Sequence, residues 1–252
     1  MARCVAAGGV VVFPTDTVYG LGCDAENPDA VRRLYRLKGR DEGKPAAVIW
    51  GSVDAMFAEL AELGPRTREA LERLLPGPVT ALVPNPLGRY PLACGTGGGG
   101  RGVGAGGGVG AGGGVGAGRG VGAGAGGAAG GDGAGGGGSG AGGGGLLGLR
   151  VPLGRPGPDL GGDLDRPLLQ SSANHAGGPD ARRLGDVPEA IRDGADLVLD
   201  GGELPGVAST VVDLSEYESS GAWRLVRAGA LSAEEIRVRL DRRPPGSGPG
   251  DC

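Results

Sequence analysis

The amino-acid sequence predicts an α/β (α+β) fold, a single domain built on a twisted mixed sheet. Two observations predict it. Strand-like and helix-like segments alternate through residues 10–83, whereas short strand-like segments predominate after residue 145. Glycine and proline separate most of these segments, and no apolar run approaches the roughly 18 residues that a membrane-spanning helix needs. We therefore expect no association with a membrane.

The first predicted strand covers residues 10–13, a run of valines and phenylalanine between Gly9 and Pro14. β-Branched and aromatic side chains in a short apolar run are typical of a buried strand. The same reasoning predicts strands at residues 46–50 and 78–83. Apolar positions at helical spacing predict helices at residues 52–63 and 65–75.

The first long helix is predicted from its end signals. Asn27 can cap the amino end, Pro28 suits the first helical position, and Asp29 places an acid in the first turn. We expect this helix to run to about Leu37, because Gly39 stops it.

The second half is predicted to be rich in strands and to end in a helix. Strands are expected at residues 147–151, 167–171, 197–199, 209–214 and 223–226. Ser232 and Glu235 form a capping-box pattern, which predicts the start of the last helix.

A glycine-rich tract interrupts this domain. Residues 95–145 hold 33 of the 60 glycines, and ordering them would cost on the order of 50–100 kcal/mol with little apolar burial in return. We predict a domain over residues 1–235, a disordered insertion at 95–145 within it, and a disordered tail at 241–252.

The cysteines and the histidine exclude several kinds of site. Four cysteines form no C-x-x-C pair, which suits a reducing, cytoplasmic location and gives no zinc-ligand spacing. His175 is the only histidine, so a histidine metal cluster is excluded, and we expect no metal site built from protein ligands alone.

Positive charge is concentrated near the predicted helix end. The net charge is −4, yet residues 32–44 hold six basic and two acidic residues, and the only two lysines, Lys38 and Lys44, lie there. In an extended segment, Lys38 and Arg40 would point the same way and present two cations to one anion. A solvated helix end with favourable charges is the alternative interpretation.

Two loops carry hydroxyl and amide groups. Pro14-Thr-Asp-Thr17 follows the first strand, and Ser171-Ser-Ala-Asn174 follows a later one. Such loops line many substrate sites, but a Ser/Asn cluster seen alone is more often plain turn chemistry.

Taken together, these segments carry a family resemblance. The chain is similar to the YrdC-like family over most of residues 8–231 outside the glycine tract. The resemblance rests on the following runs, which occur in the family's order: GVVVFPTDTVYGLG at 9–22, LKGR at 37–40, LPGPVT at 75–80, LRVP at 149–152, SAN at 172–174, STVVD at 209–213 and RAG at 227–229.

The resemblance implies a twisted domain around a basic cavity. It implies a nucleotidyltransferase that joins L-threonine, bicarbonate or CO2, and ATP (with Mg²⁺) into threonylcarbamoyl-AMP and pyrophosphate. The product would feed a downstream tRNA threonylcarbamoyl-transfer machinery, and tRNA or double-stranded RNA is a further possible partner.

The resemblance also implies roles for individual residues, all expected at the cavity. Lys38 and Arg40, at its rim, would be the catalytic pair that holds the ATP phosphates. The other ATP-binding residues would be Ser172, Asn174 and Arg227, and the threonine-binding residues would be Thr17, Arg150 and Ser209, with Arg150 facing the carboxylate.

Two alternatives stay open at the level of sequence. The altered loop after Arg150, where Leu153 follows Pro152, and the glycine tract favour a catalytically impaired YrdC-like RNA-binding or regulatory protein. Related carbamoyl-adenylate chemistry is the other alternative.

Overall fold

The computed structural model describes residues 1–41, 43–94, 145–154 and 166–241. The predicted glycine-rich insertion, apart from Gly145, and the predicted tail, apart from Asp241, lie outside these residues. The strands of the described part are β1 (Val11–Pro14), β2 (Tyr19–Asp24), β3 (Ala47–Ile49), β4 (Val79–Pro84), β5 (Leu146–Arg150), β6 (Leu168–Ser172), β7 (Leu197–Val198), β8 (Thr210–Asp213) and β9 (Arg224–Arg227).

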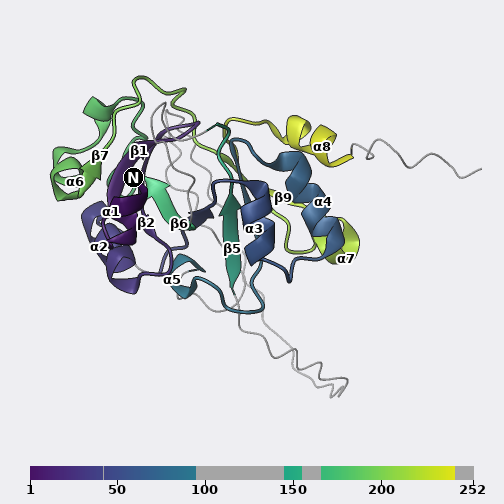
Figure 1. The fold of residues 1–252 in the computed structure, drawn as a ribbon. Helices are drawn as coiled ribbons and strands as arrows, with labels where there is room; N and C mark the ends of the chain where they lie inside the picture. Colours follow the sequence, from purple (N-terminus) through teal and green to yellow (C-terminus); the bar gives the residue numbers. More distant parts are fainter. Residues whose placement is uncertain (42, 95–144, 155–165, 242–252) are drawn as a thin grey trace, which may run out of the picture.

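The described strands form one mixed sheet of nine strands, in the order β7-β1-β2-β6-β3-β5-β4-β8-β9 (Figure 1). Three of the strand pairs are parallel (β1 with β7, β3 with β5, β4 with β8), and the other five are antiparallel. The predicted α/β (α+β) class with a mixed sheet is therefore confirmed.

Strand β2 is the one described strand that the sequence did not predict. It contains two glycines, Gly20 and Gly22. Both lie in the sheet, where a Cβ on Gly22 would lie 2.8 Å from the Phe13 ring and one on Gly20 would lie 3.0 Å from the Gln170 amide. The glycines make room for neighbouring side chains.

One group of helices lies at one end of the sheet. Near β1 and β2 are α1 (Ala2–Ala6), α2 (Pro28–Lys38) and α6 (Glu189–Gly194), as Figure 1 shows. The remaining helical elements are α3 (Val53–Glu59), α4 (Pro65–Leu74), α5 (Pro91–Cys94), the 3-10 turn η1 (Leu184–Asp186), α7 (Tyr217–Ser220) and α8 (Ala233–Asp241). In the described part of the chain, no helix has the length and apolar character needed to cross a bilayer.

The end signals of α2 act as predicted. The side chain of Asn27 accepts hydrogen bonds from the backbone N–H groups of Asp29 and Ala30, both at 3.1 Å. Gly39 adopts φ 61°, the left-handed conformation that ends helices. The helix reaches Lys38, one residue further than expected, so Lys38 belongs to its last turn.

Strand β1 is buried on both faces. Val12 packs into the large core cluster with residues of α2, whereas Val11 and Phe13 pack with Val5 of α1 in a smaller cluster on the other face. This two-sided burial explains why the sequence of β1 is a continuous apolar run rather than an alternating one.

The two residues that flank the glycine tract lie together. A Cβ on Gly145 would lie 3.7 Å from the Cβ of Cys94, and the Gly145 carbonyl accepts a hydrogen bond from the Asn85 N–H at 3.2 Å. We expect that replacing residues 97–144 by a six-residue linker leaves the fold intact and raises the free energy of unfolding by about 1–2 kcal/mol, because a shorter loop costs less entropy to close. Urea titration measures this. A destabilised but still folded product would contradict it.

Candidate active site

The predicted site residues lie at the ends of several strands. The register pairs Thr80 with Val211 and Val211 with Arg227, and it places Arg150 next to Thr80 on the other side. Register partners, and residues two apart on a strand, share one face of a sheet. The side chains of Thr80, Arg150 and Arg227 therefore start from the same face, as does that of Ser209, which directly precedes β8.

Lys38 joins the end of α2 to the loop after β6. Its Nζ donates to the backbone oxygen of Ser172 at 2.5 Å and of Asn174 at 2.9 Å, and to the side-chain oxygens of Asn174 at 2.6 Å and Ser172 at 3.3 Å. The Asn174 amide in turn donates to the Gly178 carbonyl at 2.6 Å. An ammonium group has three protons, so these four acceptors occupy it fully.

The position of Lys38 at a cavity rim, expected from sequence, is wrong. Only 3% of the residue is exposed. Burial, and to a smaller extent the charge of Arg40, lower the pKa of Lys38 from its ordinary 10.5 to about 8, while Asp180 opposes the shift. Lys38 shares the buried face of α2 with Leu34 and Tyr35, four and three residues before it, so its side chain points inward against the Ser172–Asn174 loop.

Arg40 lies beside this loop with donor capacity left. It donates to the Ser171 hydroxyl at 3.1 Å and to the Pro45 carbonyl, while its Nε, which is buried, has no hydrogen-bond partner in the part of the chain that the structure describes. Burial also lowers the pKa of Arg40. A partly buried guanidinium with a free N–H is suited to bind an anion.

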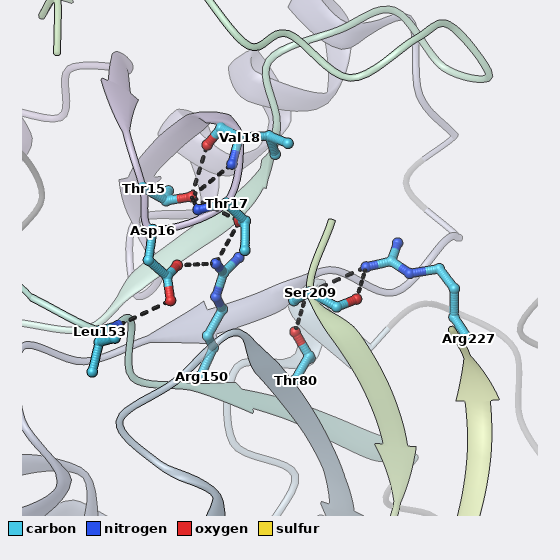
Figure 2. A network of polar contacts seen from close by, with 9 residues as sticks. All are labelled: Thr15, Asp16, Thr17, Val18, Thr80, Arg150, Leu153, Ser209 and Arg227. Atoms are coloured by element: carbon cyan, nitrogen blue, oxygen red, sulfur yellow. Dashed lines mark hydrogen bonds and ion pairs between the residues drawn. The ribbon is translucent and has the colours of Figure 1, made fainter. Parts of the chain in front are cut away.

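Arg150 forms the centre of a second polar cluster (Figure 2). Its NH2 group donates to a carboxylate oxygen of Asp16 and to the Thr17 hydroxyl, the latter at 2.7 Å. Only 4% of the Arg150 side chain and 7% of the Asp16 side chain are exposed. Thr15 closes the turn, because its hydroxyl donates to the Val18 carbonyl at 2.7 Å.

Ser209 and Arg227 form a third group, on the right of Figure 2. Arg227 donates to the backbone oxygen of Ser209 at 2.8 Å and to its hydroxyl at 3.3 Å, and the Thr80 hydroxyl lies 2.9 Å from the Ser209 hydroxyl.

Electrostatics connects the three groups. Burial lowers the pKa of Arg227, Asp180 raises it, and Arg150 lowers it. Asp180 also raises the pKa of Lys38. The phosphate candidates and the threonine candidates are thus close enough to influence one another's charge. Among them, hydrogen bonds join Lys38 to Ser172 and Asn174, Arg150 to Thr17, and Arg227 to Ser209.

Four polar residues near these groups were missed from sequence. Thr15 and Asp16 lie in the Pro14–Thr17 segment, for which the sequence indicated hydroxyl groups in general and a role for Thr17 only. Thr80 lies in the quoted LPGPVT run but was given no role, and Asp180 follows the Ser172–Asn174 loop without any pattern to mark it. His175 is exposed on that same loop, as expected for a loop residue.

The family of the chain follows from comparison with known proteins. A family model described as "Telomere recombination", which names Sua5, YciO and YrdC, matches residues 3–104 and 139–229. The chain belongs to this family. The resemblance inferred from the short runs is thereby confirmed.

Relatives within the Sua5/YciO/YrdC family carry informative names. The threonylcarbamoyl-AMP synthase of Thiobacillus denitrificans is 47% identical over 77 residues, which cover 31% of this chain and 41% of the relative. That of Pyrococcus abyssi is 26% identical over 236 residues, covering 93% of this chain and 54% of the relative. The crystal structure of P. abyssi Sua5 complexed with L-threonine is 25% identical with a TM-score of 0.65, over 95% of this chain and 56% of that one.

These matches cover only part of each relative. In each of the three, the aligned part is little more than half of the relative's length or less. The fold and the family are therefore shared along nearly the whole of this chain, while the relatives extend further.

Proposed function

We propose that the chain is a threonylcarbamoyl-AMP synthase, a nucleotidyltransferase that uses L-threonine, bicarbonate or CO2, and ATP. The observation that carries the proposal is that two groups suited to different anions lie close to each other. Lys38 and Arg40 with the Ser172–Asn174 loop suit phosphates, and the buried Arg150 beside Thr17 suits a carboxylate. The names of the relatives, and the threonine in one of their structures, support the same substrates.

On the nucleotide side, Arg40 would contact the phosphates directly. The Arg40 guanidinium is only partly buried and makes two hydrogen bonds in the described part of the chain, whereas Lys38 is occupied by four oxygen acceptors. Lys38 then supplies positive charge and holds Ser172 and Asn174 in place. Arg227, which is partly desolvated by its neighbours yet accessible to solvent, would approach the nucleotide from the opposite strand.

On the threonine side, Arg150 would bind the α-carboxylate. Thr17 and Ser209 offer hydroxyl groups to the substrate, and both are buried, so a bound amino acid would be shielded from water. Such shielding strengthens charge–charge contacts.

The reaction needs positioning rather than an enzymic nucleophile. The threonine amine and bicarbonate give a carbamate and water. A carbamate oxygen then forms a bond to the α-phosphorus of ATP, the bond between that phosphorus and the bridging oxygen breaks, and pyrophosphate leaves. Aligning the two anions and neutralising their charge is what Arg40, Lys38 and Arg150 can do.

Mg²⁺ would enter with ATP. The described residues contain no group of three or more metal-ligating side chains. Mg²⁺ needs only one or two carboxylates when phosphates supply the other ligands, and Asp180 is a carboxylate within electrostatic reach of Lys38 and Arg227. Asp180 and the phosphates would hold the ion, which neutralises phosphate charge.

The product would be consumed by a transfer step that carries the threonylcarbamoyl group to tRNA. Direct binding of tRNA or double-stranded RNA, and a cytoplasmic location, stay predictions from the sequence.

The proposal is tested by pyrophosphate release from the purified chain with ATP, Mg²⁺ and bicarbonate, with and without L-threonine. We expect release that depends on threonine. We expect Arg40→Gln to lower kcat/KM for ATP about 100-fold, as loss of a charge-assisted phosphate contact would. Arg36→Gln, on the exposed side of α2 four residues before Arg40, is the matched control and should behave as wild type.

Two results would count against the proposal. No threonine-dependent release from folded wild-type protein would favour a catalytically impaired binding or regulatory protein. Equal activity of the Arg40 and Arg36 variants would remove Arg40 from the phosphate site.

A further inference from the structure

The guanidinium of Arg150 is held from one side only. A single terminal nitrogen of the guanidinium, Nη2, donates to both Asp16 and Thr17, whereas Nε is buried and has no hydrogen-bond partner among the described residues. A guanidinium carries five N–H donors in a rigid fork, so fixing one nitrogen fixes the direction of the others. Arg150 thus keeps unused donors in a set orientation (Figure 2).

Asp16 connects two segments that are far apart in sequence. One carboxylate oxygen accepts from Arg150, and the other accepts from the backbone N–H of Leu153 at 3.0 Å. The β1–β2 turn is thereby attached both to the last residue of β5 and to the loop that follows it. The turn itself is closed by Thr15, so Asp16 has little freedom to follow a displaced guanidinium.

Stability alone gives a weak reason for this ion pair. A buried pair loses in desolvation much of what it gains in attraction, and apolar residues of similar size often replace such pairs without loss. A fixed orientation for a group that must bind a planar carboxylate is a better reason, because two parallel N–H···O bonds require that the two planes align.

We propose that Asp16 is a positioning residue that orients Arg150 toward the α-carboxylate of the amino-acid substrate. This inference rests on the proposed function. Asp16 does not itself touch the substrate; it holds the Nη2 edge of Arg150 together with Thr17 and leaves the remaining N–H groups directed toward the carboxylate. The negative charge of Asp16 also offsets that of the guanidinium, so Arg150 suits one carboxylate rather than a triphosphate.

The test compares three variants by steady-state pyrophosphate release. Asp16→Asn keeps the size and an acceptor oxygen but removes the charge, and Asp16→Glu keeps the charge but moves it along the side chain. Asp29→Asn is the matched control, because Asp29 also pairs with an arginine, Arg32, but is exposed. Thermal unfolding checks that each variant is folded.

We expect Asp16→Asn and Asp16→Glu each to raise KM for L-threonine 10- to 100-fold, with KM for ATP within twofold of wild type. Asp29→Asn should change neither. If Asp16→Asn does not fold, Asp16→Glu carries the test alone.

The inference is overturned if both KM values rise together, or if the Asp16 variants keep the wild-type KM for threonine. It is likewise overturned if Asp16→Asn raises KM for threonine but Asp16→Glu has the wild-type KM, because the charge at position 16 and not its exact place would then matter. A folded wild type without threonine-dependent release overturns the proposed function, and this inference with it. An active wild type with unaffected Asp16 variants overturns the inference alone.

Discussion

Replacing Lys38 with methionine is expected to lower the free energy of unfolding by about 2–4 kcal/mol and to abolish threonine-dependent pyrophosphate release. Methionine keeps the length of the side chain but leaves the oxygens of Ser172 and Asn174 without their shared donor, and unsatisfied buried acceptors are costly. A lysine at a cavity rim, as the resemblance implied, would instead leave the fold intact when replaced. Urea denaturation of the wild type and the variant decides between these outcomes.

The dependence on pH provides a control for the same residue. The pKa of Lys38 is about 8 in the folded protein and close to its ordinary 10.5 when unfolded. Between these values the unfolded chain holds a proton that the folded chain has released, so the contribution of Lys38 to the free energy of unfolding increases as pH rises through this window. Lys38→Met should lack that increase. Activity should show the opposite trend in wild type, since KM for ATP rises once Lys38 loses its charge. If the free energy of unfolding depended on pH in the same way in the wild type and in Lys38→Met, this account would be contradicted.

Replacing Arg150 with glutamine is expected to have the second large effect. It leaves the carboxylate of Asp16 buried without a counter-charge, which costs about 3–5 kcal/mol when one partner of a buried pair is removed. It also removes the group proposed to bind the threonine carboxylate. We expect a lower urea midpoint and no saturation by L-threonine.

A double-mutant cycle separates these two effects. Combining Arg150→Gln with Asp16→Asn removes both charges, so the pair should recover most of the lost stability while threonine dependence stays absent. A double variant whose destabilisation equals the sum of the single ones would show that the two side chains do not interact. Arg166→Gln is a suitable control, since Arg166 also pairs with an aspartate, Asp24, but is half exposed.

Local signals in the sequence predicted the regular elements well. The caps of α2 and α8 follow directly from Asn27, Gly39, Ser232 and Glu235. Strand β2 was missed because glycine has a low intrinsic strand preference. The glycine at position 22 is needed because the ring of Phe13, on the neighbouring strand, occupies the space of a side chain there. Short helices such as α1 and α6 were missed because they hold too few residues for a periodic pattern.

The candidate site was predictable as a set of residues but not as a geometry. The short runs indicated Lys38, Arg40, Ser172 and Asn174, and the structure brings these together. The burial of Lys38 depends on a loop more than 130 residues away, so no local pattern could reveal it. Asp16 was missed for the same reason. An aspartate between two threonines in a turn is explained by turn chemistry alone, and only the structure shows that Arg150 lies beside it.

The order of the strands has a consequence for how the protein folds. Strand β6 lies between β2 and β3, and β5 lies between β3 and β4, so β2, β3 and β4 cannot pair with one another as neighbours. A chain synthesised only to residue 94 holds four strands with just one of their adjacent contacts, β1 with β2, available. Such long-range pairing is slow to form, and we expect a nascent chain to stay open until β5 and β6 have left the ribosome. The contacts of Lys38 with Ser172 and Asn174, and of Arg150 with Thr17, would then form only late in folding.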